Sequence, residues 1–480
     1  MNNKFFLTTS IPYVNADPHI GMALELVQAD VIARHHREQG DDTYYLNGTD
    51  ENSLKNVLAA KEAGQEVSMF VDKKVATFKN LNTALKISND AFIRTTEKRH
   101  FDGAQKLWSA CKPEDIYKKS YEGLYCVGCE AFYTEDELVD GKCSEHNQPL
   151  EKVQEENYFF KLSNYQKELE QLIESDTYKV LPETRKNEVL SFIKSGLQDF
   201  SISRSKERAH GWGVPVPGDD SQVMYVWFDA LSNYFTALDY ATDGELYKKY
   251  WPADLHYIGK GIIRFHAVYW PAMLLSAGIK LPKSLFVHGY LTKDGKKISK
   301  STGNVVDPFE LVEKYGVDAT RYYLLRYVHP VQDSDFTFEN FEKNYTADLV
   351  NGLGNLCARV AGLVEQNNVE LETSSKPVDK NLNAKVDTAV DNFQFDTALK
   401  LIWAKISEVD SYIDQHQPWA LAKDGKKDEL KEVLQFARDR IIEVAEVLAI
   451  FLPGKAERIT SQFSSATIKK DKPLFPRLTK

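Results

Sequence analysis

The feature that most constrains the fold is a strand, a turn and a helix close to the N-terminus. Residues 5–9 are apolar or β-branched, which predicts a buried strand. Residues 23–38 place apolar side chains at helical spacing. The turn at 12–21 therefore opens a βαβ unit, whose helix N-terminus offers backbone N–H groups to phosphate. We expect Gly21 to let a ligand approach the backbone and His19 to donate to a phosphoryl oxygen. The alternative for His19 is an ordinary turn residue on the surface.

The rest of the chain alternates strand and helix patterns, with an interruption between about residues 115 and 220. This order predicts an α/β fold with a doubly wound parallel (Rossmann-like) sheet, split by an insertion. Past about residue 340 the apolar spacing is helical throughout, which predicts a C-terminal α-helical bundle. At 480 residues several domains are expected. The expected boundaries are 1–115, 116–220, 221–283, 284–340 and 341–480.

Composition and charge exclude several classes of protein. A hydrophobic content of 42% and a charged content of 27% are typical of a soluble globular chain. No run approaches the ~18 apolar residues of a membrane helix, so we expect no membrane contact. The N-terminus leads directly into a strand without a signal peptide, which favours a cytoplasmic protein. The net charge of -10 argues against DNA binding, although a local basic face would suffice for another nucleic acid.

Two short motifs predict a metal site within the insertion. Cys126 and Cys129 form a Cys-x-x-Cys pair, and Cys143 and His146 form a Cys-x-x-His pair. Four such ligands match one tetrahedral zinc, and because protein groups fill every position the zinc would be structural. The chain has only five cysteines, which suggests a reducing compartment and favours a metal over a disulfide. Chance spacing or a disulfide is the alternative.

Two further segments, 43–51 and 223–230, are predicted as strands. Residues 43–51 have the pattern of a strand that runs into a polar turn. Asp50 in that turn could hold an amine or a ribose hydroxyl, or it could cap the helix predicted at 56–63. The apolar run at 223–230 predicts another buried strand.

A loop rich in lysine, serine and glycine occupies residues 294–304, directly after a strand predicted at 286–291. Lys297 and Lys300, three residues apart beside hydroxyl groups and glycines, could wrap a triphosphate and follow its charge as it redistributes. The alternative is a solvated surface loop.

The turn and the loop together resemble the two signatures of the class I aminoacyl-tRNA synthetases, His-x-Gly-His and Lys-Met-Ser-Lys-Ser. They read Pro18-His19-Ile20-Gly21-Met22 and Lys297-Ile298-Ser299-Lys300-Ser301, in the expected order, with the predicted zinc insertion between them. Within that class the chain resembles the methionyl-tRNA synthetase family, from Phe5 to Leu478. The resemblance implies ATP-dependent attachment of methionine to tRNA(Met) through a methionyl-adenylate, with Mg²⁺ accompanying ATP. It also implies that 284–340 contacts phosphate and the tRNA stem, and that 341–480 binds the anticodon.

The resemblance also implies the site residues. The methionine pocket would be lined by Ile11, Tyr13, Trp227, Ala230, Leu231, Tyr234, Ile262 and His266, with Asp50 on the substrate ammonium. An aromatic cup suits a polarizable thioether, although each ring alone could be ordinary core packing. ATP would contact His19, Gly21, Gly259, Lys297, Ser299, Lys300 and Ser301, of which His19, Lys297 and Lys300 would be catalytic. The anticodon would be read by Asn355 and Arg359, through hydrogen bonds, and by Trp419, through stacking.

Three positions depart from the family pattern. Met22 replaces the second His of the first signature, and Asn52 stands where a His is usual. Gly261 stands where an acidic residue holds the adenosine ribose, and losing such a bond costs about 1.5–3 kcal/mol unless Asn52 or Glu51 substitutes. Two further hypotheses are therefore a diverged paralogue that activates another acid and a tRNA-binding protein with weakened catalysis. Since no dimerisation domain follows the helical region, we expect a monomer.

Overall fold

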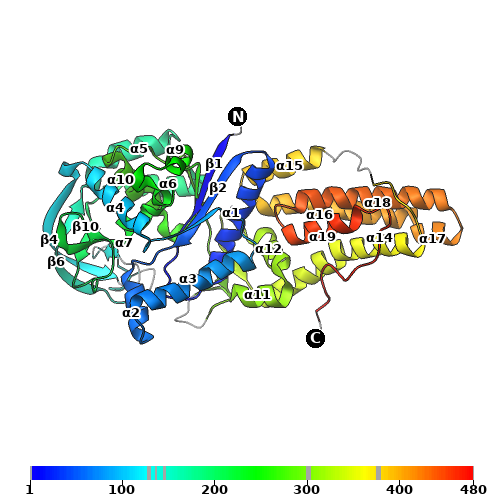
Figure 1. Ribbon diagram of the computed structural model, residues 1–480, viewed down its shortest axis with the longest axis horizontal. Coiled ribbons are helices and arrows are strands. Elements are labelled where there is room, and N and C mark those ends of the chain that lie inside the picture. The colour runs from blue at the N-terminus through cyan, green and yellow to red at the C-terminus, as the bar shows by residue number, and fades with distance from the viewer. Residues whose placement is uncertain are drawn as a thin grey trace. The chain divides into compact units, whose positions relative to one another are not determined.

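The computed structural model describes residues 3–126, 131–133, 135, 138–143, 148–298, 304–373 and 380–478 (Figure 1). The chain forms two compact units. Unit 1 comprises Met1–Pro18, His36–Asn82 and Ser88–His288, and unit 2 comprises His19–His35, Thr83–Ile87 and Gly289–Lys480. No helix in the described part of the chain is long and apolar enough to cross a membrane.

Unit 1 is built on a parallel sheet with the strand order β3-β2-β1-β12-β13-β7 in the described chain. The strands are β1 Lys4–Thr9, β2 Asp42–Thr49, β3 Ala91–Arg94, β7 Lys179–Leu181, β12 Leu255–Gly259 and β13 Ser284–His288. Their apolar side chains, such as Phe6, Leu46 and Val287, are fully buried. Since both faces of such a sheet must be covered, the continuous apolar runs of these strands are expected. The predicted parallel α/β sheet and its strands near residues 5, 43 and 286 are confirmed.

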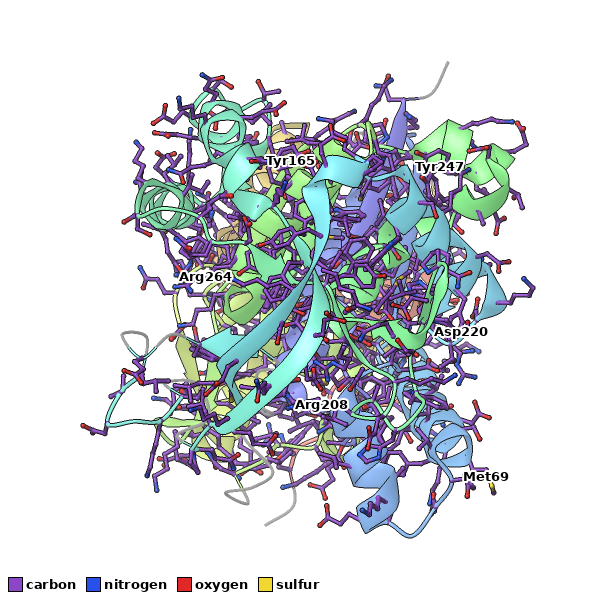
Figure 2. The ribbon with its side chains drawn as sticks, turned by 90° about the vertical axis from the view of Figure 1, so that its left-hand side faces the viewer. Met69, Tyr165, Arg208, Asp220, Tyr247 and Arg264 are labelled. Carbon is purple, nitrogen blue, oxygen red and sulfur yellow. The ribbon has the colours of Figure 1, made fainter. Side chains whose placement is uncertain are left out.

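Helices of unit 1 connect and cover these strands. They are α2 Leu54–Glu62, α3 Val67–Ala84, α4 Lys98–Ala110, α5 Gln166–Glu174, α6 Glu183–Lys194, α7 Val226–Leu231, α8 Asn233–Thr236, α9 Glu245–Tyr250 and α10 Trp270–Ser276. Short helical turns lie at η1 Pro113–Asp115, η3 Leu162–Tyr165, η4 Tyr240–Thr242, η5 Lys260–Ile262 and the π-helix η6 Phe265–Tyr269. Within the predicted insertion, an antiparallel sheet has the order β5-β4-β6-β8. Its strands are β4 Ile116–Cys126, β5 Ala131–Tyr133, β6 Glu151–Phe160 and β8 Phe200–Ser201, and β4 and β6 form a long twisted ribbon (Figure 2).

One prediction about unit 1 is wrong, and one strand was not predicted. The apolar run at 223–230 is not a strand of the main sheet. Its first two residues end β11 (Asp219–Met224), and α7 begins at Val226. β11 instead pairs antiparallel with β9 Ser203–Ser205 and β10 Pro215–Val216. Periodicity cannot separate a buried helix from a buried strand in so short an apolar run. The edge strand β7 was also not predicted, since it is only three residues long.

Unit 2 combines a small sheet with helices. The sheet has the order β15-β14-β16, with β14 Leu291–Lys293, β15 Lys296–Lys297 and β16 Ser334–Phe336. The helices are α1 Ile20–Glu38, most of which lies in this unit, α11 Pro308–Tyr315, α12 Val317–Arg326, α13 Phe338–Asn344, the π-helix η8 Tyr345–Gly354, α14 Asn355–Gln366, α15 Lys380–Asp391, α16 Phe395–His416, α17 Pro418–Lys423, α18 Lys427–Leu448 and α19 Pro453–Phe463. Figure 1 shows α14, α16, α18 and α19 running alongside one another. The predicted helical C-terminal region is therefore confirmed, and its predicted apolar faces on α16 and α18 are buried.

One buried ion pair connects the first helix of unit 2 to its C-terminal helices. Arg321 of α12 and Asp30 of α1 lie 2.8 Å apart, and both side chains are fully buried. The Arg321 guanidinium also donates to the backbone oxygens of Leu85, Ile450 and Phe451 at 2.7–3.2 Å. A buried charge that satisfies several acceptors at once fixes the relative position of the segments that carry them.

We expect Arg321→Met to lower the free energy of unfolding by about 3–5 kcal/mol, because it leaves Asp30 and three buried carbonyl groups short of a donor. Urea unfolding, followed by circular dichroism, measures this change. The control is Lys98→Met, which removes the same charge from an exposed ion pair with Asp102 and should change stability little. An Arg321→Met midpoint equal to that of Lys98→Met would refute the role of the pair.

Candidate active site

The positions expected to line a methionine pocket come together in unit 1. Tyr13 and Asp50 are neighbours through a parallel bridge, with the Asp50 amide donating to Pro12 O at 2.9 Å. The Tyr13 and Trp227 rings meet at 6.4 Å between centroids, and Trp227 lies 6.5 Å from the His266 ring. The hydrophobic core of unit 1 includes or contacts Ile11, Trp227, Leu231, Tyr234 and Ile262, and Ala230 is buried on α7. We refer to the side chains of Ile11, Tyr13, Trp227, Ala230, Leu231, Tyr234, Ile262 and His266 as the aromatic cup.

Hydrogen bonds determine the tautomer of His266 in the wall of the cup. Its Nδ1 lies 3.0 Å from the carbonyl oxygen of Ile262, which can only accept, so Nδ1 carries a proton. Nε2 then accepts from the Tyr234 hydroxyl at 2.6 Å. Both side chains are 1% exposed. The pair is therefore a buried and pre-oriented wall.

Residues that the sequence analysis did not single out support this wall. The His256 ring of β12 lies 4.3 Å from the Tyr234 ring, and its Nδ1 lies 2.6 Å from the Thr8 hydroxyl of β1. Burial, with the His266 ring as a second cause, holds the pKa of His256 well below its usual value, so this ring is neutral. Phe265, next to His266, stacks on Trp227 at 3.9 Å between centroids. The signal available in the sequence was a histidine within an apolar strand, directly before a glycine turn.

Asp50 is 2% exposed and does not cap the following helix, because Ser53 is the N-cap of α2. Its Oδ1 instead accepts from the backbone N–H of Asn52 at 3.3 Å. The Asn52 side chain in turn donates to Oδ2 of Asp229 at 2.9 Å, and Asp229 is fully buried. Asn52 thus joins two buried carboxyl groups, of which Asp229 was not predicted. Because Asp50 is not a helix cap, it remains a candidate for binding the ammonium group of a substrate.

Glu51 is not available to replace the acid that is absent at Gly261. Of the two substitutes suggested by the sequence, Asn52 and Glu51, the second is therefore wrong. Glu51 is fully buried, and Arg94 donates to its Oε2 at 2.8 Å. The hydroxyl groups of Thr49 and Thr96 also donate to it, at 2.7 and 2.5 Å. The carboxylate is therefore committed to the protein. In contrast, Oδ1 of Asn52 is buried and has no hydrogen-bond partner in the described chain, so it could still accept from a ligand.

The first turn of α1 places His19 and Gly21 together in unit 2. Nδ1 of His19 accepts from the Gly21 N–H at 3.1 Å, so the neutral ring carries its proton on Nε2, the atom expected to donate to phosphate. A Cβ on Gly21 would lie 3.0 Å from the His19 ring, which explains the glycine. The expectation of several open amides for phosphate was wrong, because the N–H groups of residues 20–23 all have acceptors in the chain.

The second signature lies partly outside the described residues. Lys297 ends β15, where its backbone pairs with Thr292. Ser299, Lys300 and Ser301 lie outside the described residues. The backbone of Ile20 nevertheless reaches the segment that follows this loop, since its N–H donates to Val306 O at 3.0 Å. Gly259, the remaining ATP candidate, ends β12 in unit 1.

Two of the four predicted zinc ligands are described, and both are buried cysteines. Cys126 ends β4, and Cys143 donates its backbone N–H to Gln148 O. Each is 1% exposed, as expected for thiolates that hold a metal away from solvent. Cys129 and His146 lie outside the described residues. The described residues alone include no group of three or more metal-binding side chains.

The predicted anticodon residues lie on two helices of unit 2. Asn355 is exposed at the start of α14. Arg359, one turn on, donates to Asp410 at 2.5 Å and to Asp414 at 2.8 Å, both on α16, so two carboxylates orient its guanidinium. Trp419, the second residue of α17, is 46% exposed, as a side chain that stacks on a base must be.

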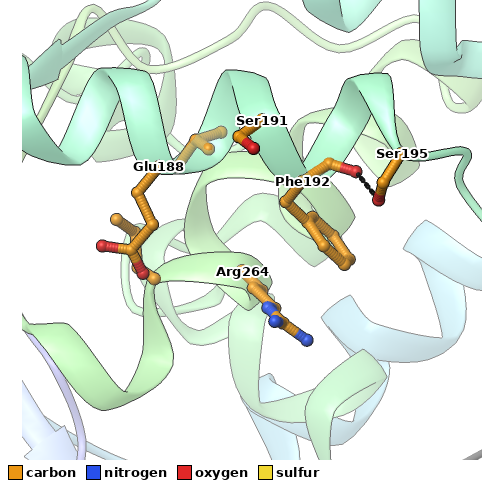
Figure 3. A pocket seen from close by; sticks show the side chains of 7 residues that line it. Glu188, Ser191, Phe192, Ser195 and Arg264 are labelled. Carbon is orange, nitrogen blue, oxygen red and sulfur yellow. Dashed lines mark hydrogen bonds between the residues drawn. The ribbon is translucent and has the colours of Figure 1, made fainter. Parts of the chain in front are cut away.

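A separate cavity of about 260 Å³ lies between α6 and the segment before η6 in unit 1 (Figure 3). It is lined by Glu188, Val189, Ser191, Phe192, Ser195, Ile263 and Arg264. Arg264 lies 4.3 Å above the Phe192 ring. None of the predicted site residues lines this cavity, so it is distinct from the aromatic cup.

Comparison with known proteins gives consistent matches. The sequence model of the family described as "tRNA synthetases class I (M)" matches residues 5–151 and 137–361. Methionine--tRNA ligase of Clostridium acetobutylicum is 44% identical over 475 residues, which cover 96% of this chain and 73% of that protein. The corresponding protein of Brucella suis is 42% identical, and the match covers 95% of this chain and 91% of that protein.

A solved structure is also similar over the whole chain. Methionyl-tRNA synthetase of Mycobacterium tuberculosis in complex with methionyl-adenylate has a TM-score of 0.92 and 38% identity, and the match covers 99% of this chain and 100% of that one. The chain therefore belongs to the methionyl-tRNA synthetases of the class I tRNA synthetase family.

Proposed function

We propose that this protein attaches methionine to tRNA(Met) in two steps, with methionyl-adenylate as the intermediate. A carboxylate oxygen of methionine attacks the α-phosphorus of ATP, which enters as its magnesium complex, and pyrophosphate leaves. A ribose hydroxyl at the tRNA 3′ end then attacks the methionyl carbonyl carbon, and AMP leaves. The observation that carries this proposal is the aromatic cup with Asp50 at its edge. Family membership favours this function over a paralogue for another acid or a tRNA-binding protein without catalysis.

Methionine recognition would rest on the residues of unit 1. The buried Tyr234–His266 pair and the Trp227 ring offer a polarizable surface to a thioether. Asp50 supplies a carboxylate for the substrate ammonium group, close to the backbone of Tyr13. Because Ala230, Leu231, Tyr234 and His266 are buried, a charged or strongly polar side chain would lose its hydration beside them.

Activation would rest on electrostatic stabilisation, since no protein nucleophile is required. His19, with its proton on Nε2, is suited to donate to a phosphoryl oxygen. Lys297 and Lys300 would neutralise the charge that moves to the leaving pyrophosphate, together with Gly21, Gly259, Ser299 and Ser301 as ATP contacts. Lys300 is the strongest catalytic candidate. Holding both substrates in line supplies much of the remaining rate enhancement.

Recognition of the tRNA would use the helices of unit 2. Trp419 is exposed and can stack on an unpaired base. Asn355 and Arg359 offer amide and guanidinium donors to base edges, with Asp410 and Asp414 keeping the Arg359 fork in place. We propose that the protein acts in the cytoplasm, where tRNA charging for protein synthesis takes place. We also propose that it is a monomer.

A structural zinc would be held by Cys126, Cys129, Cys143 and His146. The two described cysteines fit this role because both are buried, and Cys126 lies at the end of β4. When bound, the ion would tie the two knuckles together and take no part in the reaction.

The wild-type protein is expected to catalyse methionine-dependent exchange of pyrophosphate into ATP and to charge a tRNA(Met) transcript. Lys300→Ala should lower the exchange rate at least about a hundredfold, because a cation that faces the developing charge is lost. Exchange with a different amino acid would favour the paralogue, and no exchange would favour the tRNA-binding protein. Full exchange by Lys300→Ala would refute the assignment of that lysine.

Asp50→Asn is expected to raise the KM for methionine about ten- to a hundredfold and to leave the KM for ATP little changed. The substitution removes a charged hydrogen bond of about 1.5–3 kcal/mol to the ammonium, while an amide oxygen can still accept from the Asn52 N–H. Steady-state exchange kinetics measure both constants. Asp102→Asn, at an exposed position of the same unit, is the control. An unchanged KM for methionine would show that another group binds the ammonium.

The purified protein is expected to contain one zinc per chain by elemental analysis, and Cys126→Ser should lose it. Cys111→Ser is the matched control, since burial raises the pKa of the Cys111 thiol to about 12 and this residue lies outside the two knuckles. It should keep one zinc per chain. A wild-type protein without zinc, or zinc that survives in Cys126→Ser, would contradict the metal site.

A further inference from the structure

A tight hairpin precedes the second signature in unit 2. Strands β14 and β15 pair antiparallel, with Lys293 opposite Lys296, so Asp294 and Gly295 form a two-residue turn. Both turn residues have positive φ, 52° and 71°, as in the type I′ turns that match the twist of a hairpin. The chain leaves this hairpin at Lys297, the first lysine of the signature.

Asp335 of β16 fastens the hairpin to its neighbouring strand. β14 pairs parallel with β16, and Thr292 is the register partner of Asp335. Oδ1 of Asp335 accepts from the Thr292 hydroxyl at 2.6 Å and from the Gly295 N–H at the turn at 2.8 Å. One carboxylate thus holds both a strand residue and the turn.

Asn304 returns the chain to the same hairpin after the signature. Its side-chain amide donates to Lys293 O at 2.9 Å and to Lys296 O at 3.3 Å. Both acceptors are carbonyl oxygens, so the amide nitrogen must face them. The start and the end of the signature segment are therefore held at one place.

The two residues after Asn304 extend this connection to the first signature. Val305 O accepts from the Lys293 ammonium at 3.4 Å, and Val306 O accepts from the Ile20 N–H at 3.0 Å. Ile20 follows His19 directly. Residues 304–306 thus connect the hairpin that leads into Lys297 with the helix turn that carries His19, all within unit 2.

We propose that Asn304 is a positioning residue for the adenylation step, and that Asp335 assists it by holding the hairpin. Asn304 sets the separation between the two ends of the signature loop and, through residues 304–306, its place relative to His19. This inference rests on the proposed function. The amide is needed because a side chain without donors could not bond to the Lys293 and Lys296 carbonyl oxygens.

The test uses the full chain and Asn304→Asp, which keeps the shape but turns a carboxylate toward two carbonyl oxygens. Methionine-dependent ATP–pyrophosphate exchange should lose about ten- to a hundredfold in kcat, because a displaced catalytic group is costly. Binding of methionine alone, measured by calorimetry, should stay at the wild-type value, since Asn304 contributes nothing to the aromatic cup. Asn367→Asp is the matched control, because among the described residues the Asn367 side chain donates to Leu363 O alone, one turn back at the end of α14.

A double-mutant cycle with Lys300→Ala separates positioning from other roles. If Asn304 acts by placing the lysine, Asn304→Asp should cost less than about threefold once Lys300 is alanine. Asp335→Asn should retain activity, because its amide oxygen can still accept both hydrogens, whereas Asp335→Ala should lose kcat. The proposal is overturned by a wild-type kcat in Asn304→Asp, by a parallel loss of methionine binding, or by full additivity with Lys300→Ala. Absence of exchange in the wild-type protein would instead refute the proposed function.

Discussion

The parallel pairing of β1 with β12 is the constraint on which the candidate site of unit 1 depends. These strands are 248 positions apart where Thr8 meets His256, yet they are direct neighbours in the sheet. Ile11 and Tyr13 follow the carboxyl end of β1, Asp50 follows that of β2, and Ile262 and His266 follow that of β12. Ligands of open parallel sheets bind at this edge because the segments that leave it diverge. The sheet therefore assembles the aromatic cup from segments that are remote in sequence.

Unit 2 meets a related requirement with hydrogen bonds rather than strand pairing. The short segment 304–306 contacts Ile20 of the first signature, and it contacts Lys293 and Lys296 of the hairpin that precedes the second signature. The buried Arg321–Asp30 pair holds the same first helix to the C-terminal helices. Charge stabilisation requires groups in fixed positions, and these contacts explain how a helix turn and a loop from distant parts of the chain stay in register.

Much of the fold could be predicted from the sequence, because long periodic segments report their environment. The strands at 5–9 and 43–51, and the apolar faces of α16 and α18, follow from burial on one or both sides. The errors arose where a tertiary contact decides. The run at 223–230 would be apolar both as a strand and as a buried helix. The structure divides it between the end of β11 and α7.

The candidate site was predicted in part, for similar reasons. Family resemblance could name Asp50 and the aromatic residues, since each carries a recognisable side chain at a recognisable place. It could not reveal that Arg94 occupies Glu51, or that His256 supports Tyr234. It also could not reveal that the amides of the first turn of α1 are already bonded. Hydrogen-bond partners depend on the geometry of neighbours and leave no pattern in one sequence.

The central claim is that the aromatic cup with Asp50 at its edge selects the amino acid. A crystal structure with a non-hydrolysable methionyl-adenylate analogue tests this claim most directly. The account predicts the thioether between the Trp227 ring and the Tyr234–His266 wall, with the ammonium nitrogen within about 3 Å of an Asp50 oxygen. A thioether bound elsewhere, with the cup empty and Asp50 away from the ligand, would contradict it.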